Sequence, residues 1–305
     1  MNKPDISVIL PTFNRGNEVN HAIDSILNQT LNNLELIIIN DASTDNTKQV
    51  LDEYQKKDPR IKIINNAQNY GCAQSRNIGL QHIQSNTIAF MDDDDQYSDT
   101  ETLKCLYNQI QCDDADIVIS DYEVNGELRN MNKFGKNFKY YITVKPGPFL
   151  QCVLIKKNLI ENNEISFDSQ ATPSEDWEFF ITLAQTNPLV TYCRSNSFKW
   201  QLNQNSQSIN FLKEAQSLAY ICDKHYEYMI KNIGKKLIAN HYRRIARVYE
   251  KTDSTNQINA FYKKAFEQYP YSIKNIFYLL MVSIGYNNTK FIINWMRKIR
   301  GVPNA

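Results

Sequence analysis

The 305-residue sequence has few of the residues that interrupt regular structure, with nine glycines and nine prolines. Flexible linkers and low-complexity segments need many more of both, so the composition argues against a largely disordered chain. Long apolar runs are also missing, since no stretch of about 18 apolar residues occurs and no transmembrane helix is expected. The 42% of hydrophobic residues still suffices for a substantial core.

Cysteine and histidine are scarce as well. The six cysteines form no C-x-x-C pair and have the spacing of neither a zinc site nor a disulfide framework. Residues 1–5 contain no apolar core of a signal peptide, so a reducing, cytoplasmic location is expected. The four histidines are scattered, and no Ser-His or Cys-His arrangement for nucleophilic catalysis is visible.

The net charge of +1 hides an uneven distribution. Residues 231–305 carry 14 Lys and Arg against 3 Asp and Glu, a balance of +11. Residues 1–230 carry 20 against 30, a balance of −10. An acidic first part with a basic end suggests two roles, the basic end facing an anionic partner.

Apolar segments of strand length alternate with helical periodicity over the first 120 residues. Strands are expected at 6–10, 34–39, 61–64, 87–91 and 116–120, with Pro11 ending the first. Near-continuous apolar strands joined by helices predict an α/β fold, with a mostly parallel sheet covered by helices on both faces. From about residue 211 four or five amphipathic helices follow instead. We therefore predict two domains, residues 1–210 and 211–305.

Polar residues stand where these predicted strands end. They are Thr12 and Asn14, Asp41, Asn69, and the run Asp92-Asp93-Asp94-Asp95. Parallel sheets bind ligands at the carboxyl ends of their strands. Carboxylates crowded at the end of a buried strand repel one another, and a divalent cation relieves that repulsion.

The same segments resemble the family 2 glycosyltransferases of GT-A fold. Five blocks spread over residues 6–210 are similar, in order, to motifs of that family: SVILPTFNR at 7–15, SILNQT with ELIIINDASTD at 25–45, NYGCAQSRNIG at 69–79, FMDDDDQY at 90–97, and SEDWEF at 174–179. The resemblance implies a Rossmann-like GT-A domain and a nucleotide-diphosphate sugar donor, with UDP as the expected nucleotide. It also implies a Mn²⁺ or Mg²⁺ ion and transfer with inversion to a saccharide or lipid-linked acceptor, in bacterial surface polysaccharide biosynthesis.

The resemblance also implies roles for single residues. Nucleotide contacts are expected from Pro11, Thr12, Phe13, Asp41, Asn69, Arg76, Asp92 and Asp93. Asp94 of the DXD motif is expected to bind the metal, and Asp176 to act as the general base that takes the acceptor hydroxyl proton. Glu175 and Trp177 are weaker candidates for contact with a sugar. Inversion by one displacement needs such a base and no enzymatic nucleophile.

Structural interpretations stand beside these roles. The aspartate run is compatible with a solvated turn in which Asp95 or Ser98 caps the next helix, and Asp41 with a cap at a helix entry. Arg76 is compatible with a surface ion pair, and Asp176 with an acidic first turn that favours the helix dipole. Trp177 either stacks on a sugar or packs in the core.

One departure from the family pattern falls after the fifth block, where Gln201 and Asn203 replace basic residues. This leaves a non-catalytic nucleotide-sugar-binding protein as an alternative. A metal-dependent nucleotidyltransferase is another alternative, although such an enzyme would need a basic phosphate-binding loop and residues 11–17 offer only Arg15.

The basic helical end has three interpretations: a packing appendage or oligomer contact, a contact with an anionic membrane surface, or nucleic-acid binding. The last is disfavoured because no recognisable module interleaves aromatic and basic residues. We hypothesise peripheral membrane contact, because Trp295, Arg297, Lys298 and Arg300 follow the apolar segment 277–284.

Overall fold

The computed structural model describes residues 3–145, 147, 149–200, 210–252 and 254–285. The chain forms two compact units, residues 1–170 with 175–204 and residues 171–174 with 205–305. A domain boundary between residues 210 and 211 remains our proposal. Gln201, Asn203 and the basic segment around Trp295 lie outside the described residues.

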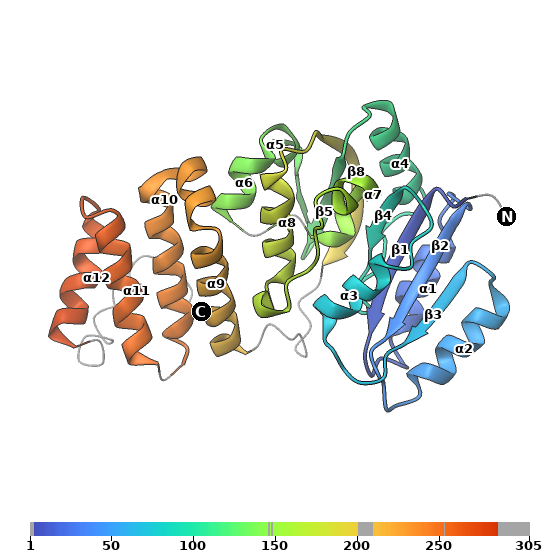
Figure 1. The fold of residues 1–305 in the computed structure, drawn as a ribbon, viewed down its shortest axis with the longest axis horizontal. Coiled ribbons are helices and arrows are strands. Elements are labelled where there is room, and N and C mark those ends of the chain that lie inside the picture. The colour runs from blue at the N-terminus through green and yellow to red at the C-terminus, as the bar shows by residue number, and fades with distance from the viewer. Residues whose placement is uncertain (1–2, 146, 148, 201–209, 253, 286–305) are drawn as a thin grey trace. The chain divides into compact units, whose positions relative to one another are not determined.

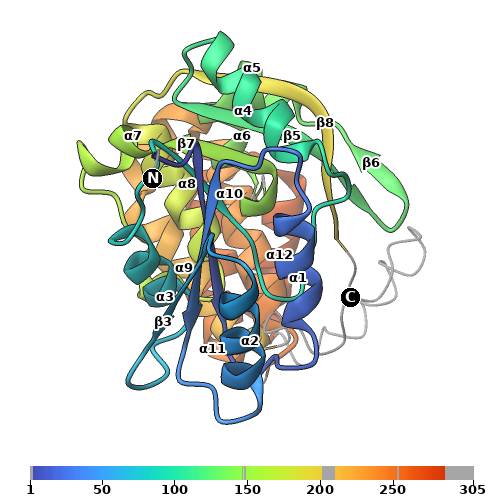
Figure 2. The ribbon, with the colours of Figure 1, turned by 90° about the vertical axis from the view of Figure 1, so that its right-hand side faces the viewer.

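A mixed sheet is the centre of the first unit (Figures 1 and 2). Its strands are β1 Ile6–Thr12, β2 Leu34–Asn40, β3 Ile61–Asn65, β4 Thr87–Phe90, β5 Ile117–Val124, β6 Glu127–Arg129, β7 Val153–Lys156 and β8 Val190–Trp200. The order is β3-β2-β1-β4-β7-β5-β6, and β8 pairs with β5. β1 to β4 are parallel to one another, and β5 is parallel to β8. β7 is antiparallel to both of its neighbours, β4 and β5, and β6 is antiparallel to β5. The predicted α/β class is confirmed.

Helices cover both faces of this sheet, as the alternation of side chains along β1 shows. The helices are α1 Val19–Leu27, α2 Thr47–Lys57, α3 Cys72–Leu80, α4 Thr102–Cys112, α5 Asn132–Lys136, α6 Phe138–Val144, α7 Lys157–Glu161 and α8 Glu175–Gln185, with short 3₁₀ turns at Leu150–Cys152 and Ser169–Ala171. Val8 and Leu10 share one buried cluster with Ile23 of α1, Leu51 of α2 and Leu106 of α4. Ile9 points to the opposite face, where α3 lies.

Gly79 allows α3 to lie close against β1. A Cβ atom at this position would lie 2.5 Å from Cγ2 of Ile9, so any larger residue would push the helix away from the strand. Arg76 is one turn earlier on the same helix. The close approach therefore fixes how far the Arg76 side chain stands from the carboxyl end of the sheet.

Pro11 lies within β1, so the expectation that it ends the strand is wrong. Thr12 O accepts from Asp41 N on the β2 side, and Ile9 O accepts from Met91 N on the β4 side. The backbone N of Pro11 points toward β4, as the backbone of Ile9 does, but Pro11 lies beyond Ile9, the last residue of β1 that pairs with β4. Its missing N–H therefore costs no ladder hydrogen bond.

The described part of the second unit contains four helices packed in chain order (Figure 1): α9 Phe211–Lys224, α10 Tyr226–Tyr249, α11 Thr255–Gln268 and α12 Ile273–Ile284. α12 packs on α11 through stacked rings of Tyr262 and Tyr278, whose centroids are 4.3 Å apart. The buried Asn275 amide donates to the carbonyls of Ala265 and Tyr269 at 3.0 and 2.7 Å. Within the described ranges, no helix combines the length and apolar character needed to cross a membrane.

Candidate active site

The four aspartates form a turn directly after β4, at the carboxyl end of the parallel strands. Asp95 N donates to Asp92 O at 3.2 Å, which closes the turn. Phe13 N, from the end of β1, donates to Oδ2 of Asp93 at 3.3 Å. The Arg15 guanidinium approaches Asp93 at 3.6 Å and Asp94 at 4.0 Å. Residues following two adjacent strands therefore meet here, as predicted from the positions of the strand ends.

Arg76 connects this turn to the start of α8, about eighty residues later in the sequence. Its Nη2 donates to Oδ1 of Asp92 at 2.6 Å and its Nη1 to Oε1 of Glu175 at 2.9 Å. The guanidinium also lies over the Phe167 ring, 5.3 Å from its centroid. Only 4% of Arg76 is exposed, so the surface ion pair is excluded. A buried arginine thus holds the first turn of α8, which contains Asp176, against the aspartate turn.

Gln151 is a member of the site that the sequence did not reveal. Its Nε2 donates to Oδ2 of Asp92 at 2.8 Å and to Oδ2 of Asp95 at 2.6 Å. Asp95 is therefore engaged within the turn, and α4 begins only at Thr102, so the expected capping role of Asp95 is wrong. Gln151 belongs to a 3₁₀ turn without motif or periodicity, and no sequence signal marked it.

The electrostatics of the turn favour a bound cation. Burial, together with the charges of Asp94 and Asp92, raises the pKa of Asp93 to about 7. Burial and the three preceding carboxylates raise the pKa of Asp95 to about 8. The pKa of Asp94 is also raised by burial and by Asp92, although Arg15 opposes this shift. Negative charge is thus poorly compensated by the protein alone.

The fit of a Mg²⁺ or Mn²⁺ ion follows from these donors. Carboxylate oxygens are the ligands that such ions prefer, and one or two of them suffice when phosphate oxygens complete the shell. The Asp94 side chain is 31% exposed, about as much as the Asp92 side chain at 32%, but it lacks the hydrogen bonds to Arg76 and Gln151 that engage Asp92. Among the described residues, no group of three or more His, Cys, Asp or Glu side chains is arranged to hold a metal.

Asp41 organises the loop that follows β3. Its Oδ1 accepts from Asn66 Nδ2 at 2.7 Å and from Tyr70 N at 2.9 Å, and its Oδ2 accepts from Gly71 N at 2.8 Å. Gly71 has a φ of 84°, a conformation that favours glycine. The Asn69 side chain accepts from the same Gly71 N–H at 3.1 Å. Asp41 and Asn69 therefore meet in the loop that leads into α3.

Asp41 does not cap α2, since its carboxylate is bound in the loop after β3, and Asp45 is the residue that accepts from Thr47 N, at the start of α2, at 2.9 Å. The Asp41 loop is joined to the residues around Arg76 through α3. Asn66 of the loop also donates to Ser75 Oγ at 3.2 Å, and Ser75 directly precedes Arg76.

Asp176 lies in the first turn of α8 beside Glu175. Its Oδ1 accepts from Trp177 N at 2.7 Å, which is the expected favourable contact with the helix start. Burial, the neighbouring Glu175 and Asp92 raise the pKa of Asp176 to about 6. Such a carboxylate is ionised at neutral pH and is more basic than an exposed aspartate, as a general base requires.

Trp177 is a core residue. Only 1% of it is exposed, and its Nε1 donates to the Ile142 carbonyl at 2.7 Å. Of the two interpretations of Trp177, the structure supports packing, because the ring has no open face for a sugar. Glu175 is likewise buried and contacts Arg76, so it positions the arginine.

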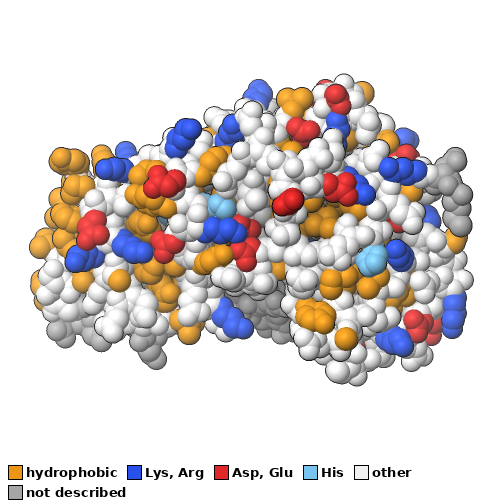
Figure 3. All heavy atoms as spheres, in the orientation of Figure 1, with side chains coloured by type: hydrophobic (Ala, Val, Ile, Leu, Met, Phe, Trp, Pro, Cys, Tyr) orange, Lys and Arg blue, Asp and Glu red, His pale blue; other side chains and the backbone are white. Residues whose placement is uncertain are grey.

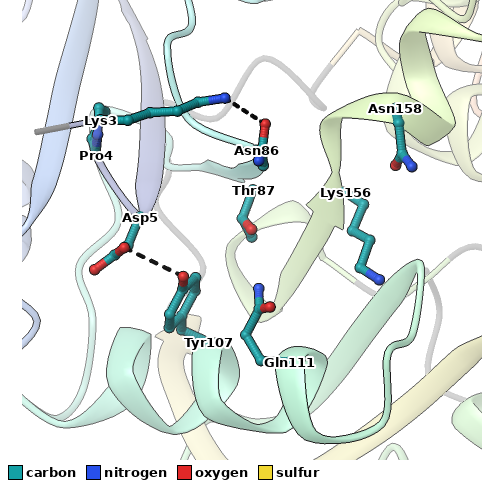
Figure 4. A pocket seen from close by; sticks show the side chains of 9 residues that line it. All are labelled: Lys3, Pro4, Asp5, Asn86, Thr87, Tyr107, Gln111, Lys156 and Asn158. Atoms are coloured by element: carbon teal, nitrogen blue, oxygen red, sulfur yellow. Dashed lines mark hydrogen bonds between the residues drawn. The ribbon is translucent and has the colours of Figure 1, made fainter.

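A cavity of ≈ 440 Å³ lies at the opposite ends of the strands, away from the aspartate turn (Figure 4). It is lined by Lys3, Pro4, Asp5, Asn86, Thr87, Tyr107, Gln111, Lys156 and Asn158. These residues surround the amino ends of β1 and β4, and the lining includes none of the predicted site residues. The cavity is therefore separate from the candidate active site.

The mixed sheet, the helices on both faces and the acidic turn at the carboxyl edge define an α/β protein of the GT-A class. Residues 7–162, about half of the chain, match the sequence profile described as Glycosyl transferase family 2. The chain belongs to the family 2 glycosyltransferases.

Two relatives and one solved structure extend this assignment. The chain is 33% identical to "Glycosyltransferase GlyG" of Streptococcus pneumoniae serotype 4, over 45% of this chain but only 44% of that protein. It is 27% identical to "UDP-Glc:alpha-D-GlcNAc-diphosphoundecaprenol beta-1,3-glucosyltransferase WfgD" of Escherichia coli, over 68% of this chain and 81% of that protein. S. aureus TarS 1–349, solved in complex with UDP-GlcNAc, shares the fold with a TM-score of 0.62 at 17% identity, covering 87% of this chain and 89% of that one.

Proposed function

We propose that the protein is an inverting glycosyltransferase that moves a sugar from a UDP-sugar to a hydroxyl group of a saccharide or lipid-linked acceptor, in the synthesis of a bacterial surface polysaccharide. The observation that carries this proposal is the link made by Arg76 between the aspartate turn and the first turn of α8. In the proposed enzyme it would join the region that binds the diphosphate to a basic carboxylate in one site.

The donor half of the proposal rests on the acidic turn and the loop of Asp41. Asp94, with Asp92 or Asp93, would hold a Mn²⁺ or Mg²⁺ ion, which when bound offsets the charge on the leaving diphosphate. The end of β1 at Pro11 and Thr12, the exposed Phe13 that follows it, and the Asp41 loop would contact the nucleotide. The solved TarS complex with UDP-GlcNAc and the UDP-Glc named for WfgD support UDP as the nucleotide.

The acceptor half rests on Asp176. In a single displacement this carboxylate takes the proton of the acceptor hydroxyl, and the acceptor oxygen forms a bond to the anomeric carbon. The bond from that carbon to the diphosphate oxygen breaks, and the diphosphate leaves with the electron pair. Glu175 and Arg76 hold the first turn of α8 so that Asp176 lies near the donor site. The diphosphoundecaprenol named for WfgD supports a lipid-linked acceptor.

A panel of UDP-, GDP- and dTDP-sugars, tested with Mn²⁺ for binding, hydrolysis and transfer, examines the proposal. Asp176→Asn should lower kcat by about 10²- to 10⁴-fold and leave the Kd for UDP within about threefold. Asp52→Asn, a partly buried aspartate of α2 outside the site, is the matched control and should keep full activity. Wild-type protein that binds donors and never turns them over would favour the non-catalytic alternative, and transfer of a nucleotidyl group would favour the nucleotidyltransferase.

A further inference from the structure

Exposed hydrophobic side chains gather on α12, the last described helix of the second unit. Ile273, Ile276 and Leu280 are 84%, 42% and 58% exposed, and Tyr271 just before the helix is 84% exposed. The spacing i, i+3, i+7 places the three aliphatic side chains on one face of the helix. In Figure 3 hydrophobic side chains gather over α12, at the left edge of the view. We call Tyr271, Ile273, Ile276 and Leu280 the α12 stripe.

The opposite face of α12 is firmly attached to α11, so the stripe is a stable feature of the folded unit. Asn275 and Met281 are buried, and the Tyr278 ring stacks on Tyr262. Arg243 of α10 donates to Asn275 Oδ1, which ties the inner face to a third helix. Several large apolar side chains this exposed on one face of a helix mark a surface that binds another molecule.

The net charge of this part of the sequence selects the kind of partner. Residues 211–305 carry 16 Lys and Arg against 6 Asp and Glu, a balance of +10. After Glu267 the remaining 38 residues contain five Lys and Arg and no Asp or Glu. A second copy of this unit would be repelled by that charge, whereas an anionic surface would be attracted.

We propose that the α12 stripe binds the surface of an anionic lipid bilayer, with the helix lying in the plane of the interface. A helix of 12 residues is too short to span the hydrocarbon core, which needs about 20 residues. Apolar side chains on one face, a tyrosine at the helix start and a basic sequence are the properties of an interfacial helix. Such binding would bring the active site to the membrane where a lipid-linked acceptor is found.

Flotation of the full-length protein with vesicles tests this inference and needs neither donor nor acceptor, so its outcome is independent of the proposed reaction. Binding is expected to phosphatidylglycerol vesicles at about 0.1 M salt, roughly tenfold weaker at about 0.5 M salt, and weak to phosphatidylcholine vesicles. The variant Ile273→Ser/Ile276→Ser/Leu280→Ser should bind at least roughly tenfold more weakly.

The matched control is Leu128→Ser/Leu189→Ser, which changes two leucines of the first unit that are 58% and 57% exposed and should leave binding unchanged. Circular dichroism confirms that each variant is folded. The inference is overturned if the wild type fails to float with phosphatidylglycerol at low salt, or if the triple variant floats like the wild type. A concentration-dependent dimer that the triple variant abolishes, without vesicle binding, would assign the stripe to a second copy instead.

Discussion

Replacing Arg76 by methionine should destabilise the first unit more than any change of a surface charge. The substitution keeps much of the side-chain volume and removes the charge that Asp92 and Glu175 share at 2.6 and 2.9 Å. Removing one partner of a buried ion pair costs about 3–5 kcal/mol, because the remaining charge is left without compensation. The Asp92 side chain is 32% exposed and can regain water, whereas the Glu175 side chain is only 10% exposed. We therefore expect a loss near the lower end, about 3 kcal/mol.

Urea unfolding followed by tryptophan fluorescence, to which the buried Trp177 contributes, measures this loss. The control Lys104→Met breaks a surface pair whose side chains are 48% and 47% exposed, and should cost less than about 0.5 kcal/mol. The double variant Arg76→Met/Glu175→Gln should regain about 1–2 kcal/mol, because the amide removes the uncompensated charge.

Two results would refute this reasoning. A loss below about 1 kcal/mol in Arg76→Met would mean that Arg76 does not form the buried bridge. If the double variant regained nothing, the loss would come from the stacking of Arg76 on Phe167 and not from the ion pairs.

Three further outcomes are expected. The pKa values of Asp93 and Asp95 are raised to about 7 and about 8, so the folded chain holds these protons more tightly than the unfolded chain. The free energy of unfolding should therefore rise as the pH falls from about 8 to about 5. In thermal melts, Mn²⁺ at about pH 8 should remove much of this dependence on pH. Gln151→Ala should cost about 1–2 kcal/mol in urea unfolding and weaken UDP binding, since two carboxylates lose their shared donor; unchanged UDP affinity would remove Gln151 from the site. Trp177→Phe should lower the free energy of unfolding by about 1–3 kcal/mol without changing the KM for the donor, whereas a raised KM would contradict its assignment to the core.

The parallel half of the sheet and the positions of its strand ends followed from the sequence, because each buried strand is a short apolar run ending in polar residues. Asp41 and the aspartate turn could be placed at one edge of the sheet for that reason. The arrangement around β5 was not accessible in this way. β7 inserts antiparallel between β4 and β5 although it begins about thirty residues after β5 ends, and only tertiary packing determines such an order.

Side-chain partners were less predictable than strand positions. Gln151 contacts two aspartates about sixty residues earlier, and nothing in its local sequence distinguishes it from any other buried glutamine. Trp177 had two equally good interpretations until its burial was known, since a tryptophan beside acidic residues suits either a sugar platform or a core. Arg76 was expected to reach toward the acidic cluster and it contacts Asp92, but its contact with Glu175 depends on how α8 returns to the sheet.

The three N–H groups held by Asp41 have a consequence for how a donor would be recognised. The carboxylate fixes the loop from Asn66 to Gly71 through contacts within the protein itself. An arriving nucleotide would lose little free energy to ordering this part of the protein, so more of its contact energy would appear as affinity. Discrimination among bases would then depend on the fit to a preformed surface, with association rates limited by encounter and not by rearrangement of this loop.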